Sequence, residues 1–419
     1  MRYLLGVLLI AWPAFAGEFG DAPQLLKDAR RGAERLPAPL GRGERIRPGG
    51  DAWVSFNRAD VGPGFPLSRP SVQNDQVAVF RVDAGALPGL SRYMHEKFKR
   101  CGGFFGHPTR AEAEKDLAPS ASPRTERAYT LDQQAAVRPL VAQVRENEIR
   151  STISTLSAYR TRYYSSDAGA SAARWLQGRW QGLAKRIPGA TVALVSHPNW
   201  KQPSVVLTVP GTEKPEEIVV LGGHLDSINL WGDDSPAPGA DDNASGIAVL
   251  TETVRLLSQS GFRPRRTVQF MGYAAEEVGL LGSQEIAKSY SNSGKTVIAV
   301  LQLDMTNFAG SGNGLYFISD HVDAELSAFL GKLTDAYVGA SWSTIQCGYA
   351  CSDHASWSRE GFPASAAFES TMDSMNPRIH SEGDTLANSG ASAAHSVNFA
   401  KLAVAFAVET AKTGRPAHN

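Results

Sequence analysis

The segment Ile218-Val219-Val220-Leu221-Gly222-Gly223-His224 places a run of apolar, mostly β-branched residues shortly before a histidine. A short apolar run of this composition predicts a buried β-strand. The histidine follows that strand, and in open α/β sheets ligands gather beyond the strand ends. This segment therefore predicts an α/β sheet that carries a functional group at its edge.

The chain from about residue 129 onward continues the same alternation. Strands are expected at residues 204–209, 218–221, 267–271, 297–303 and 315–319. Helices are expected at residues 147–159, 168–186, 246–258, 280–290, 324–337 and 394–412. Strands that alternate with helices predict an α/β sheet covered by helices on both faces.

Acidic and histidine residues gather in five short stretches of this unit. They are His224 with Asp226, the pair Asp241-Asp242, the pair Glu276-Glu277, Asp304, and His380. Carboxylate oxygens mixed with imidazole nitrogens suit zinc, or cobalt or manganese in its place. A pair of such ions held close together would form a hydrolytic site.

Each stretch also has an ordinary structural interpretation. A single histidine at a strand end is more often structural than a ligand, an Asp-Asp pair is usually a turn or a helix cap, and a Glu-Glu pair usually faces solvent. Three stretches nevertheless follow predicted strands of one α/β unit, which favours a shared site. Asp226 lies two residues after His224, so on a continuing strand it can accept a hydrogen bond from the imidazole nitrogen that binds no metal.

The charge and hydropathy of the whole chain exclude some classes of binding partner. It has 419 residues, with 42 basic and 42 acidic side chains. Balanced charge without a dense basic run predicts no nucleic-acid partner and no membrane partner. No run after residue 16 approaches ~18 uninterrupted apolar residues, the length of a membrane span.

Residues 1–127 differ from the rest of the chain and divide into two parts. Met1-Arg2, the apolar residues 3–12 and Ala14-Phe15-Ala16 predict a secretory signal peptide over residues 1–16, with a buried helix as the alternative. We therefore expect a secreted, extracellular protein, with the periplasm as the alternative. Residues 17–127 predict a small separate domain with a strand at 76–82 and a helix at 90–99. The Pro- and Ser-rich residues 118–124 predict a joint open to proteolysis.

Six motifs in residues 128–419 resemble those of the secreted bacterial leucyl aminopeptidases, which are zinc exopeptidases with a co-catalytic metal pair. In chain order they are GGHLDS, APGADDNASG, YAAEEVGLLGSQ, LQLDMTN, CGYACSDHASW and NPRIHSEGDTL. The resemblance implies a three-layer zinc-exopeptidase fold, in which helices flank a central mixed, mostly parallel sheet. It also implies that residues 128–419 form the catalytic domain and residues 17–127 a small N-terminal prodomain.

The resemblance assigns a separate role to each candidate residue. It implies two zinc ions per chain, with ligands His224, Asp242, Glu277, Asp304 and His380, in which His224 and Asp304 bind one ion and Glu277 and His380 the other. Asp242, rather than Asp241, is then the bridging ligand. Glu276 is the general base for a water shared by the two ions, and Asp226 supports His224. Tyr349 matches a tyrosine that can donate to the developing oxyanion, and a pocket wall is its alternative role.

The implied activity is removal of single N-terminal residues, preferably leucine and other large apolar residues, from peptides with a free N-terminus. The pocket for that side chain maps onto Met305, Ile318, Phe368, Met372 and Met375. Relatives often carry aromatic residues where Met372 and Met375 stand, and flexible methionine predicts an adaptable pocket. Plain core packing is the alternative role of these methionines. Relatives suggest a monomer.

Cys347 and Cys351 frame the Tyr349 loop, and in an exported chain they predict a disulfide, with a metal clip as the alternative. Cys101 is left over. By the resemblance, residues 17–127 are a propeptide that acts as an intramolecular inhibitor or a folding chaperone, and a permanent accessory domain is the alternative. The rival functions are a glutaminyl cyclase, which keeps one zinc on the same fold, and a non-catalytic module that has lost ligands.

Overall fold

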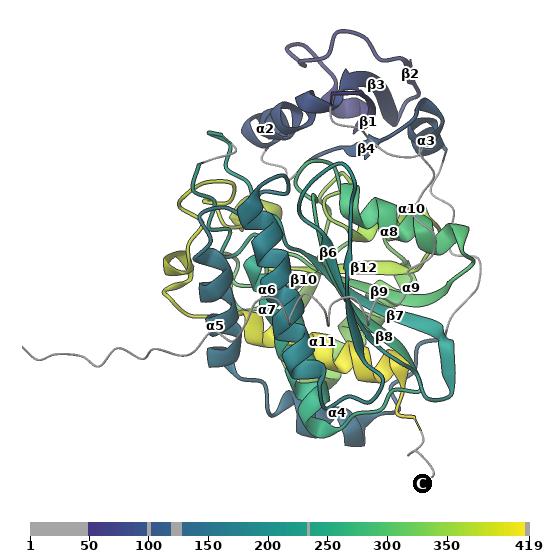
Figure 1. The fold of residues 1–419 in the computed structure, drawn as a ribbon, viewed down its shortest axis with the longest axis vertical. Coiled ribbons are helices and arrows are strands. Elements are labelled where there is room, and N and C mark those ends of the chain that lie inside the picture. Colours follow the sequence, from purple (N-terminus) through teal and green to yellow (C-terminus); the bar gives the residue numbers. More distant parts are fainter. Residues whose placement is uncertain (1–48, 99–101, 119–127, 233–234, 415–419) are drawn as a thin grey trace, which may run out of the picture. The chain divides into compact units, whose positions relative to one another are not determined.

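The computed structural model describes residues 49–98, 102–118, 128–232 and 235–414, which all belong to one compact unit of the chain. Its main feature is an eight-stranded sheet (Figure 1). In spatial order the strands are β11 (Trp342–Ile345), β10 (Leu315–Ile318), β12 (Ala364–Phe368), β9 (Thr296–Leu303), β7 (Lys214–His224), β8 (Arg266–Tyr273), β6 (Ser204–Val209) and β5 (Thr191–Val195).

Four of the seven strand pairings in this sheet are parallel and three are antiparallel. The mixed, mostly parallel sheet that was expected is therefore present. Strands β9, β7 and β8 are parallel neighbours near its centre. Their carboxyl ends consequently lie along one edge, which is the edge where α/β sheets form sites.

Alternate side chains of each strand face different helical layers. Val219 and Leu221 pack in one core, whereas Val220 packs in another. The first core includes residues of α4 (Gln134–Val141), α5 (Glu146–Ser157), α6 (Asp167–Ala184), α7 (Ala244–Ser260), α9 (Ala324–Leu333) and α11 (Ser396–Ala411). The second includes residues of α8 (Leu281–Asn292) and α10 (His354–Arg359). The sheet is thus the middle one of three layers.

Helix α7 begins at a cap that also ties it to the end of β9. The Asn243 carboxamide oxygen accepts from the backbone N–H of Gly246 at 2.9 Å, and the amide donates to the Leu303 carbonyl at 2.9 Å. A Cβ atom at position 246 would lie 2.4 Å from the Leu303 carbonyl oxygen. Only glycine therefore allows the first turn of α7 to approach β9 this closely.

The N-terminal residues 49–98 and 102–118 contain a second, four-stranded sheet in the order β2 (Val72–Gln73), β3 (Val77–Asp83), β1 (Asp51–Asn57), β4 (Phe105–His107). It carries α2 (Leu87–Phe98) and α3 (Arg110–Glu114). The hydrophobic core of this sheet also contains Ala275, Val278 and Leu281 from the segment after β8. The second sheet therefore packs on the segment that carries Glu276 and Glu277.

The elements expected from the sequence are present among the described residues, with ends shifted by a few positions. The sequence did not predict β12, whose residues Ala364-Ser365-Ala366-Ala367-Phe368 are small and poor in β-branched side chains. Strands β1, β4, β5 and β11 and helices α4 and α10 were also not predicted. The signal peptide, most of the joint and Cys101 lie outside the described residues.

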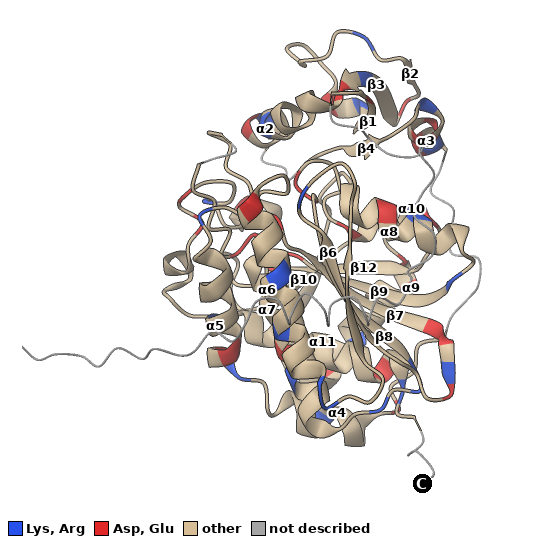
Figure 2. Cartoon of the chain, viewed as in Figure 1, with Lys and Arg blue, Asp and Glu red and all other residues tan. Residues whose placement is uncertain are grey.

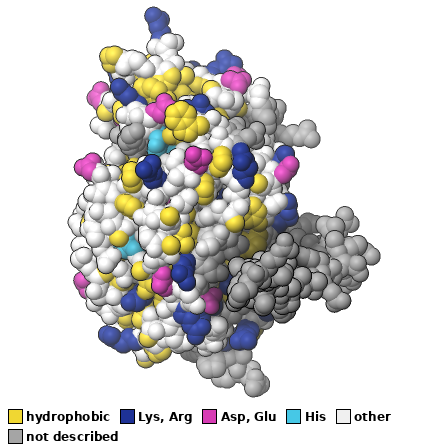
Figure 3. Space-filling model, turned by 90° about the vertical axis from the view of Figure 1, so that its left-hand side faces the viewer, with side chains coloured by type: hydrophobic (Ala, Val, Ile, Leu, Met, Phe, Trp, Pro, Cys, Tyr) yellow, Lys and Arg dark blue, Asp and Glu magenta, His cyan; other side chains and the backbone are white. Residues whose placement is uncertain are grey.

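Charged residues lie mainly on helices and loops, and the strands of the large sheet contain few of them (Figure 2). On the face drawn in Figure 3, acidic and basic side chains are interspersed. Among the described residues, no helix has the length and apolar character that crossing a membrane requires.

Candidate active site

The candidate ligands lie where the central strands end. His224 is the last residue of β7, and Asp304 directly follows β9. Glu276 and Glu277 follow β8 after a short turn, and Asp242 directly precedes the cap of α7. Because β8, β7 and β9 are parallel neighbours, these side chains meet at one edge of the sheet.

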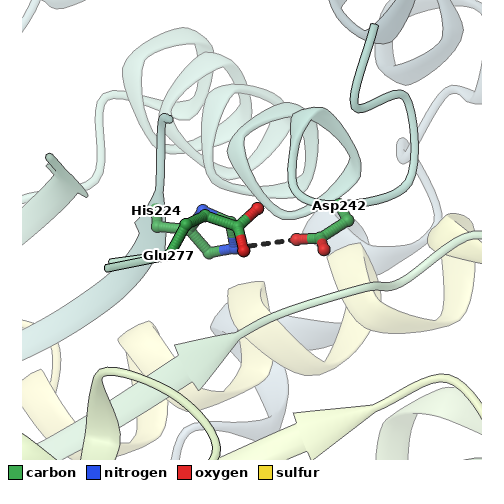
Figure 4. A group of neighbouring side chains, drawn as sticks. All are labelled: His224, Asp242 and Glu277. Atoms are coloured by element: carbon green, nitrogen blue, oxygen red, sulfur yellow. Dashed lines mark ion pairs between the residues drawn. The ribbon is translucent and has the colours of Figure 1, made fainter. Parts of the chain in front are cut away.

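Asp242 directs its two carboxylate oxygens toward two different histidines. Its Oδ1 lies 3.0 Å from Nε2 of His224, and its Oδ2 lies 3.1 Å from Nε2 of His380. Asp304 Oδ1 lies 3.3 Å from the same nitrogen of His224, and Glu277 Oε2 lies 2.8 Å from that of His380. The five predicted ligands therefore form two groups of three that share Asp242. Figure 4 shows His224, Asp242 and Glu277 converging.

The donor atoms of this cluster fit a zinc site. His224, Asp242 and Glu277 offer ligand atoms that all lie within 4.8 Å of one another. Both carboxylate oxygens of Glu276 are buried and have no hydrogen-bond partner among the described residues. A buried polar group without a partner is costly, so a cation or a water molecule beside Glu276 would complete the site. Imidazole and carboxylate ligands suit zinc.

Burial and close charges shift the pKa values in the cluster. Burial lowers the pKa of the His224 imidazole, but the negative charges of Asp304 and Glu276 outweigh it and raise that pKa well above its usual value. Burial raises the pKa of the Glu277 carboxyl to about 7, and the Asp242 charge adds to this effect. Burial also raises the pKa of Glu276 well above its usual value. Carboxylates packed this closely repel one another, and a divalent cation would relieve that repulsion.

Unusual backbone conformations accompany the cluster. Ala275, Met305 and His380 have positive φ angles of 57°, 53° and 56°. Residues other than glycine rarely adopt this conformation, and such residues concentrate at functional sites. Two of the three adjoin Glu276 and Asp304, and the third is itself a candidate ligand. The peptide bond between Asp242 and Asn243 is cis.

Asp226 lies beside His224, as expected, but its carboxylate holds a different segment. The Nδ1 atom of His224 lies 3.2 Å from the backbone carbonyl oxygen of Asp226 and 3.6 Å from its Oδ1. The carboxylate accepts hydrogen bonds from the backbone N–H groups of Glu276 at 3.1 Å and Glu277 at 3.2 Å. The carbonyl thus orients the imidazole, and the side chain fixes the two glutamates.

Asp241 points to partners outside the two groups of ligands. Its Oδ1 accepts from the Asn307 backbone N–H at 3.0 Å, and its Oδ2 from the Asn376 side-chain amide at 3.2 Å. Asp241 thus joins the loop before α7 to the loop that follows Asp304 and to the loop that contains His380. Asp241 was not expected to be the bridging ligand, and the structure gives it this connecting role instead.

Three buried charged residues around the site were not identified from the sequence. Glu369 accepts from the backbone N–H groups of Phe308 at 2.7 Å and Asn376 at 3.0 Å. Asp384 accepts from the backbone of the loop before α7. Asp384 falls within the NPRIHSEGDTL motif, which was the available signal for it. Glu369 has no comparable signal.

Arg162 is the third of these residues, and it is fully buried. Its guanidinium donates to the carbonyl oxygens of Leu225 at 2.9 Å, Gly239 at 2.9 Å and Leu156 at 3.2 Å. Burial lowers the pKa of this guanidinium to about 10, against the opposing charges of Asp384 and Asp242. Arg162 therefore places a positive charge behind the acidic cluster and joins the segments that follow β7.

All five predicted pocket residues line one cavity, whose lining also includes Asp304. They are Met305, Ile318, Phe368, Met372 and Met375. Tyr349 and Cys351 line the same cavity. The pocket thus opens directly beside the candidate metal centre.

The loop that carries Tyr349 is held on both sides. Cys347 and Cys351 form a disulfide, as expected. The Asp320 carboxylate accepts from the backbone N–H groups of Cys347 at 2.8 Å and Gly348 at 3.2 Å. The Tyr349 side chain is buried, which suits a fixed pocket wall as well as a fixed donor.

Helix α2 of the N-terminal sheet reaches the candidate metal centre. Ser91 Oγ donates to the backbone carbonyl of Glu277 at 2.7 Å. The imidazole of His95, one turn further along, contacts that of His380. The N-terminal residues therefore touch the backbone of one candidate ligand and the side chain of another.

A second contact between the N-terminal residues and the catalytic unit is ionic. Asp116 pairs with the Arg359 Nε atom at 2.5 Å and with the His107 Nε2 atom at 2.7 Å. The Arg359 guanidinium also donates to the Glu112 carbonyl at 2.6 Å. Burial opposes ionisation of Asp116, but the His107 and Arg359 charges hold its pKa well below the usual range.

Comparison with known proteins shows which family this chain is similar to. Residues 204–405 match the model of Peptidase family M28. A probable leucine aminopeptidase of Trichophyton verrucosum is 40% identical over 282 residues, which are 66% of this chain and 77% of that relative. The LapB structure of Legionella pneumophila is 29% identical with a TM-score of 0.76, covering 86% of this chain and 100% of that chain. The Legionella pneumophila LapA aminopeptidase is 25% identical with a TM-score of 0.75, covering 89% and 99%.

The matched region contains every candidate ligand, the pocket and the loop of Tyr349. It also contains the large sheet from β6 to β12 and most of α11. The resemblance to leucine aminopeptidases that the six motifs predicted is confirmed. The chain belongs to Peptidase family M28 and is a hydrolase.

Proposed function

We propose that this protein is a secreted leucyl aminopeptidase that holds two zinc ions through His224, Asp242, Glu277, Asp304 and His380. The observation that carries the proposal is the position of Asp242, whose two oxygens lie 3.0 Å and 3.1 Å from two different histidines. A carboxylate in this position can bridge two ions, each completed by one histidine and one further acid.

Two zinc ions, when bound, would polarise the scissile carbonyl and lower the pKa of a bound water molecule. Glu276 takes a proton from the attacking water and passes it to the leaving amine. Its carboxylate suits this role because it is buried at the site and has no hydrogen-bond partner among the described residues. Tyr349, which lines the adjacent cavity, donates to the oxyanion that forms at the carbonyl.

The cavity beyond Asp304 receives the side chain of the N-terminal residue. Its lining of methionines, Ile318 and Phe368 is apolar and favours leucine, methionine and phenylalanine over charged side chains. The substrates are peptides with a free N-terminus, since the free amine would lie at the metal centre next to this cavity.

The most direct test is hydrolysis of a leucine arylamide before and after metal removal with a chelator. Activity should disappear with the chelator and return when zinc is added. His380→Ala should lower the zinc content of the purified protein from two ions to one, because it removes the only histidine of one group. Activity that survives complete removal of metal would overturn the proposal.

The same measurements separate the rival functions. A glutaminyl cyclase on this fold would hold one ion per chain and would not cleave the arylamide. A non-catalytic module would not cleave the arylamide either, and it would typically have lost metal ligands. This chain keeps two groups of ligands and a glutamate at the position of the base, which favours the aminopeptidase.

The N-terminal residues support a further part of the proposal. We infer that residues 17–127 are a propeptide that blocks the site until the chain is cut near residues 118–129. The contacts of α2 with Glu277 and His380 carry this inference, because they occupy space next to two candidate ligands. The signal peptide at residues 1–16 would direct the chain out of the cell.

A further inference from the structure

Asp384 makes an unusual set of contacts with the loop before α7. The backbone N–H groups of Asp241 and Asp242 donate to its Oδ1 and Oδ2 at 3.2 Å and 3.1 Å. The backbone N–H of Ala240 donates to its carbonyl oxygen at 3.1 Å. Three consecutive N–H groups therefore bind one residue, and the last of them belongs to Asp242.

The side chain of Asp384 is buried, and the side-chain amide of Asn376 also donates a hydrogen bond to it. The amide of Asn376 donates to its Oδ1 at 3.1 Å, and the same amide reaches Asp241 Oδ2 at 3.2 Å. A buried carboxylate is costly unless its oxygens are satisfied. Here the satisfying groups are mainly the peptide groups that carry Asp242, so the hydrogen bonds fix where that side chain begins.

Asp226 repeats this arrangement elsewhere in the site. It follows His224 by two residues and accepts from the backbone N–H groups of Glu276 and Glu277. Asp384 follows His380 by four residues and accepts from those of Asp241 and Asp242. In each case a carboxylate from a histidine-bearing segment clamps the backbone of a carboxylate-bearing segment. These hydrogen bonds therefore fix the position of Glu277 relative to the His224 segment and that of Asp242 relative to the His380 segment.

We propose that Asp384 is a positioning residue for the bridging carboxylate of Asp242 and, through it, for both metal ions. This inference rests on the proposed two-zinc function. Asp384 has no direct contact with the metals in this role. It holds the peptide of Asp242 so that one oxygen faces His224 and the other faces His380. Loss of the clamp would let that carboxylate turn, and both groups of ligands would weaken together.

The test compares Asp384→Asn and Asp384→Ala with Glu382→Gln, a matched control on the same loop. The control also removes one negative charge, but Glu382 is exposed. An asparagine keeps one acceptor and places an NH2 group against a backbone N–H, whereas alanine removes both acceptors. Zinc affinity is measured by competition with a chromophoric chelator. The visible spectrum of the cobalt-substituted protein reports ligand geometry, and unfolding of the metal-free protein reports stability.

Asp384→Asn should weaken zinc binding by about 10- to 100-fold, the usual cost of losing a partner of a metal ligand. Asp384→Ala should weaken it further, and both ions should be affected. The cobalt spectrum should change, kcat should fall more than KM rises, and Glu382→Gln should match the wild type.

Several outcomes would overturn the proposal. Unchanged zinc affinity and cobalt spectrum in folded Asp384→Asn would exclude a positioning role. If both Asp384 variants fail to fold without metal, the residue serves the fold rather than the site. A weakening confined to one ion would contradict a role that acts through the shared Asp242. Wild-type protein that binds no zinc would instead refute the proposed function, and the two failures are therefore distinguishable.

Discussion

The imidazole rings of His95 and His380 lie with their centroids 4.5 Å apart and their planes tilted by 47°. His95 belongs to α2 of the N-terminal sheet, and His380 is a candidate metal ligand of the catalytic unit. One turn earlier on the same helix, Ser91 binds the backbone of Glu277. These two contacts bring one helix of the predicted propeptide against two of the three members of one ligand group, Glu277 and His380.

The first prediction concerns release of this helix. A specific protease site placed between residues 118 and 128 should allow the joint to be cut in the purified protein. Hydrolysis of a leucine arylamide should then rise by about tenfold or more, because only molecules whose site is open can bind the substrate and cutting increases their fraction. In uncut protein, His95→Ala should raise the basal rate, and Glu96→Ala, on the exposed face of the same helix, should leave it unchanged. Equal rates before and after cutting would contradict the block.

The second prediction isolates the base. Glu276→Gln should lower kcat by about 10²- to 10⁴-fold, the usual contribution of a general base, while zinc content stays at the wild-type value. Metal analysis and steady-state kinetics on the same preparation check both parts. Glu216→Gln removes an exposed glutamate of β7 and should change neither quantity. Loss of zinc together with activity would make Glu276 a ligand instead.

The third prediction concerns the side-chain pocket. Met372→Phe should shift the ratio of kcat/KM for leucine and phenylalanine substrates by about tenfold toward leucine, because a change of this size in a pocket is worth about 1–3 kcal/mol. Met372→Leu conserves volume and should keep the wild-type ratio. The ratio is measured with matched arylamides. A ratio unchanged by phenylalanine would assign Met372 to the core alone.

The fourth prediction follows from the buried Asp116. Its pKa is held below the usual value, so the carboxylate stabilises the folded protein above pH 3.8, and this contribution disappears as the pH falls toward the lowered pKa. Asp116→Asn should lower stability by about 3 kcal/mol at neutral pH, since it breaks a buried pair with Arg359 and His107.

Denaturant unfolding at several pH values checks this fourth prediction. The difference between wild type and Asp116→Asn should shrink as the pH falls below 3.8. Asp75→Asn, at an exposed position between β2 and β3, should show no such dependence. A difference that grows below pH 3.8 would mean that Asp116 is protonated in the folded protein.

Much of the site could be predicted because its signals are local in sequence. The apolar run before His224 marks a strand, and its end marks the edge of the sheet. The strands β7, β8 and β9 were all recognisable from β-branched runs. Their parallel order then places His224, Glu277 and Asp304 together. The geometry of the five ligands follows from this order and from the family motifs.

Other features depend on contacts that the sequence does not display. Strand β12 lies between β9 and β10, and its small residues are buried because neighbouring strands flank them. Their sequence has no alternation or β-branched run that would predict a strand. Arginine is usually a surface residue, yet the Arg162 guanidinium is buried and donates hydrogen bonds to four carbonyl oxygens. Asp384 gains its role from a loop more than a hundred positions earlier in the chain. Tertiary partners of this kind have no periodic signature.

The hydrogen bonds of Asp226 and Asp384 run between protein groups only. A centre whose ligands are braced in this way by the polypeptide keeps its shape when the ions leave. Stripping with a chelator should then give a stable protein that accepts a different cation without refolding. Cobalt or manganese could therefore replace zinc by simple exchange, and the choice of ion inside or outside a cell would follow supply as much as affinity.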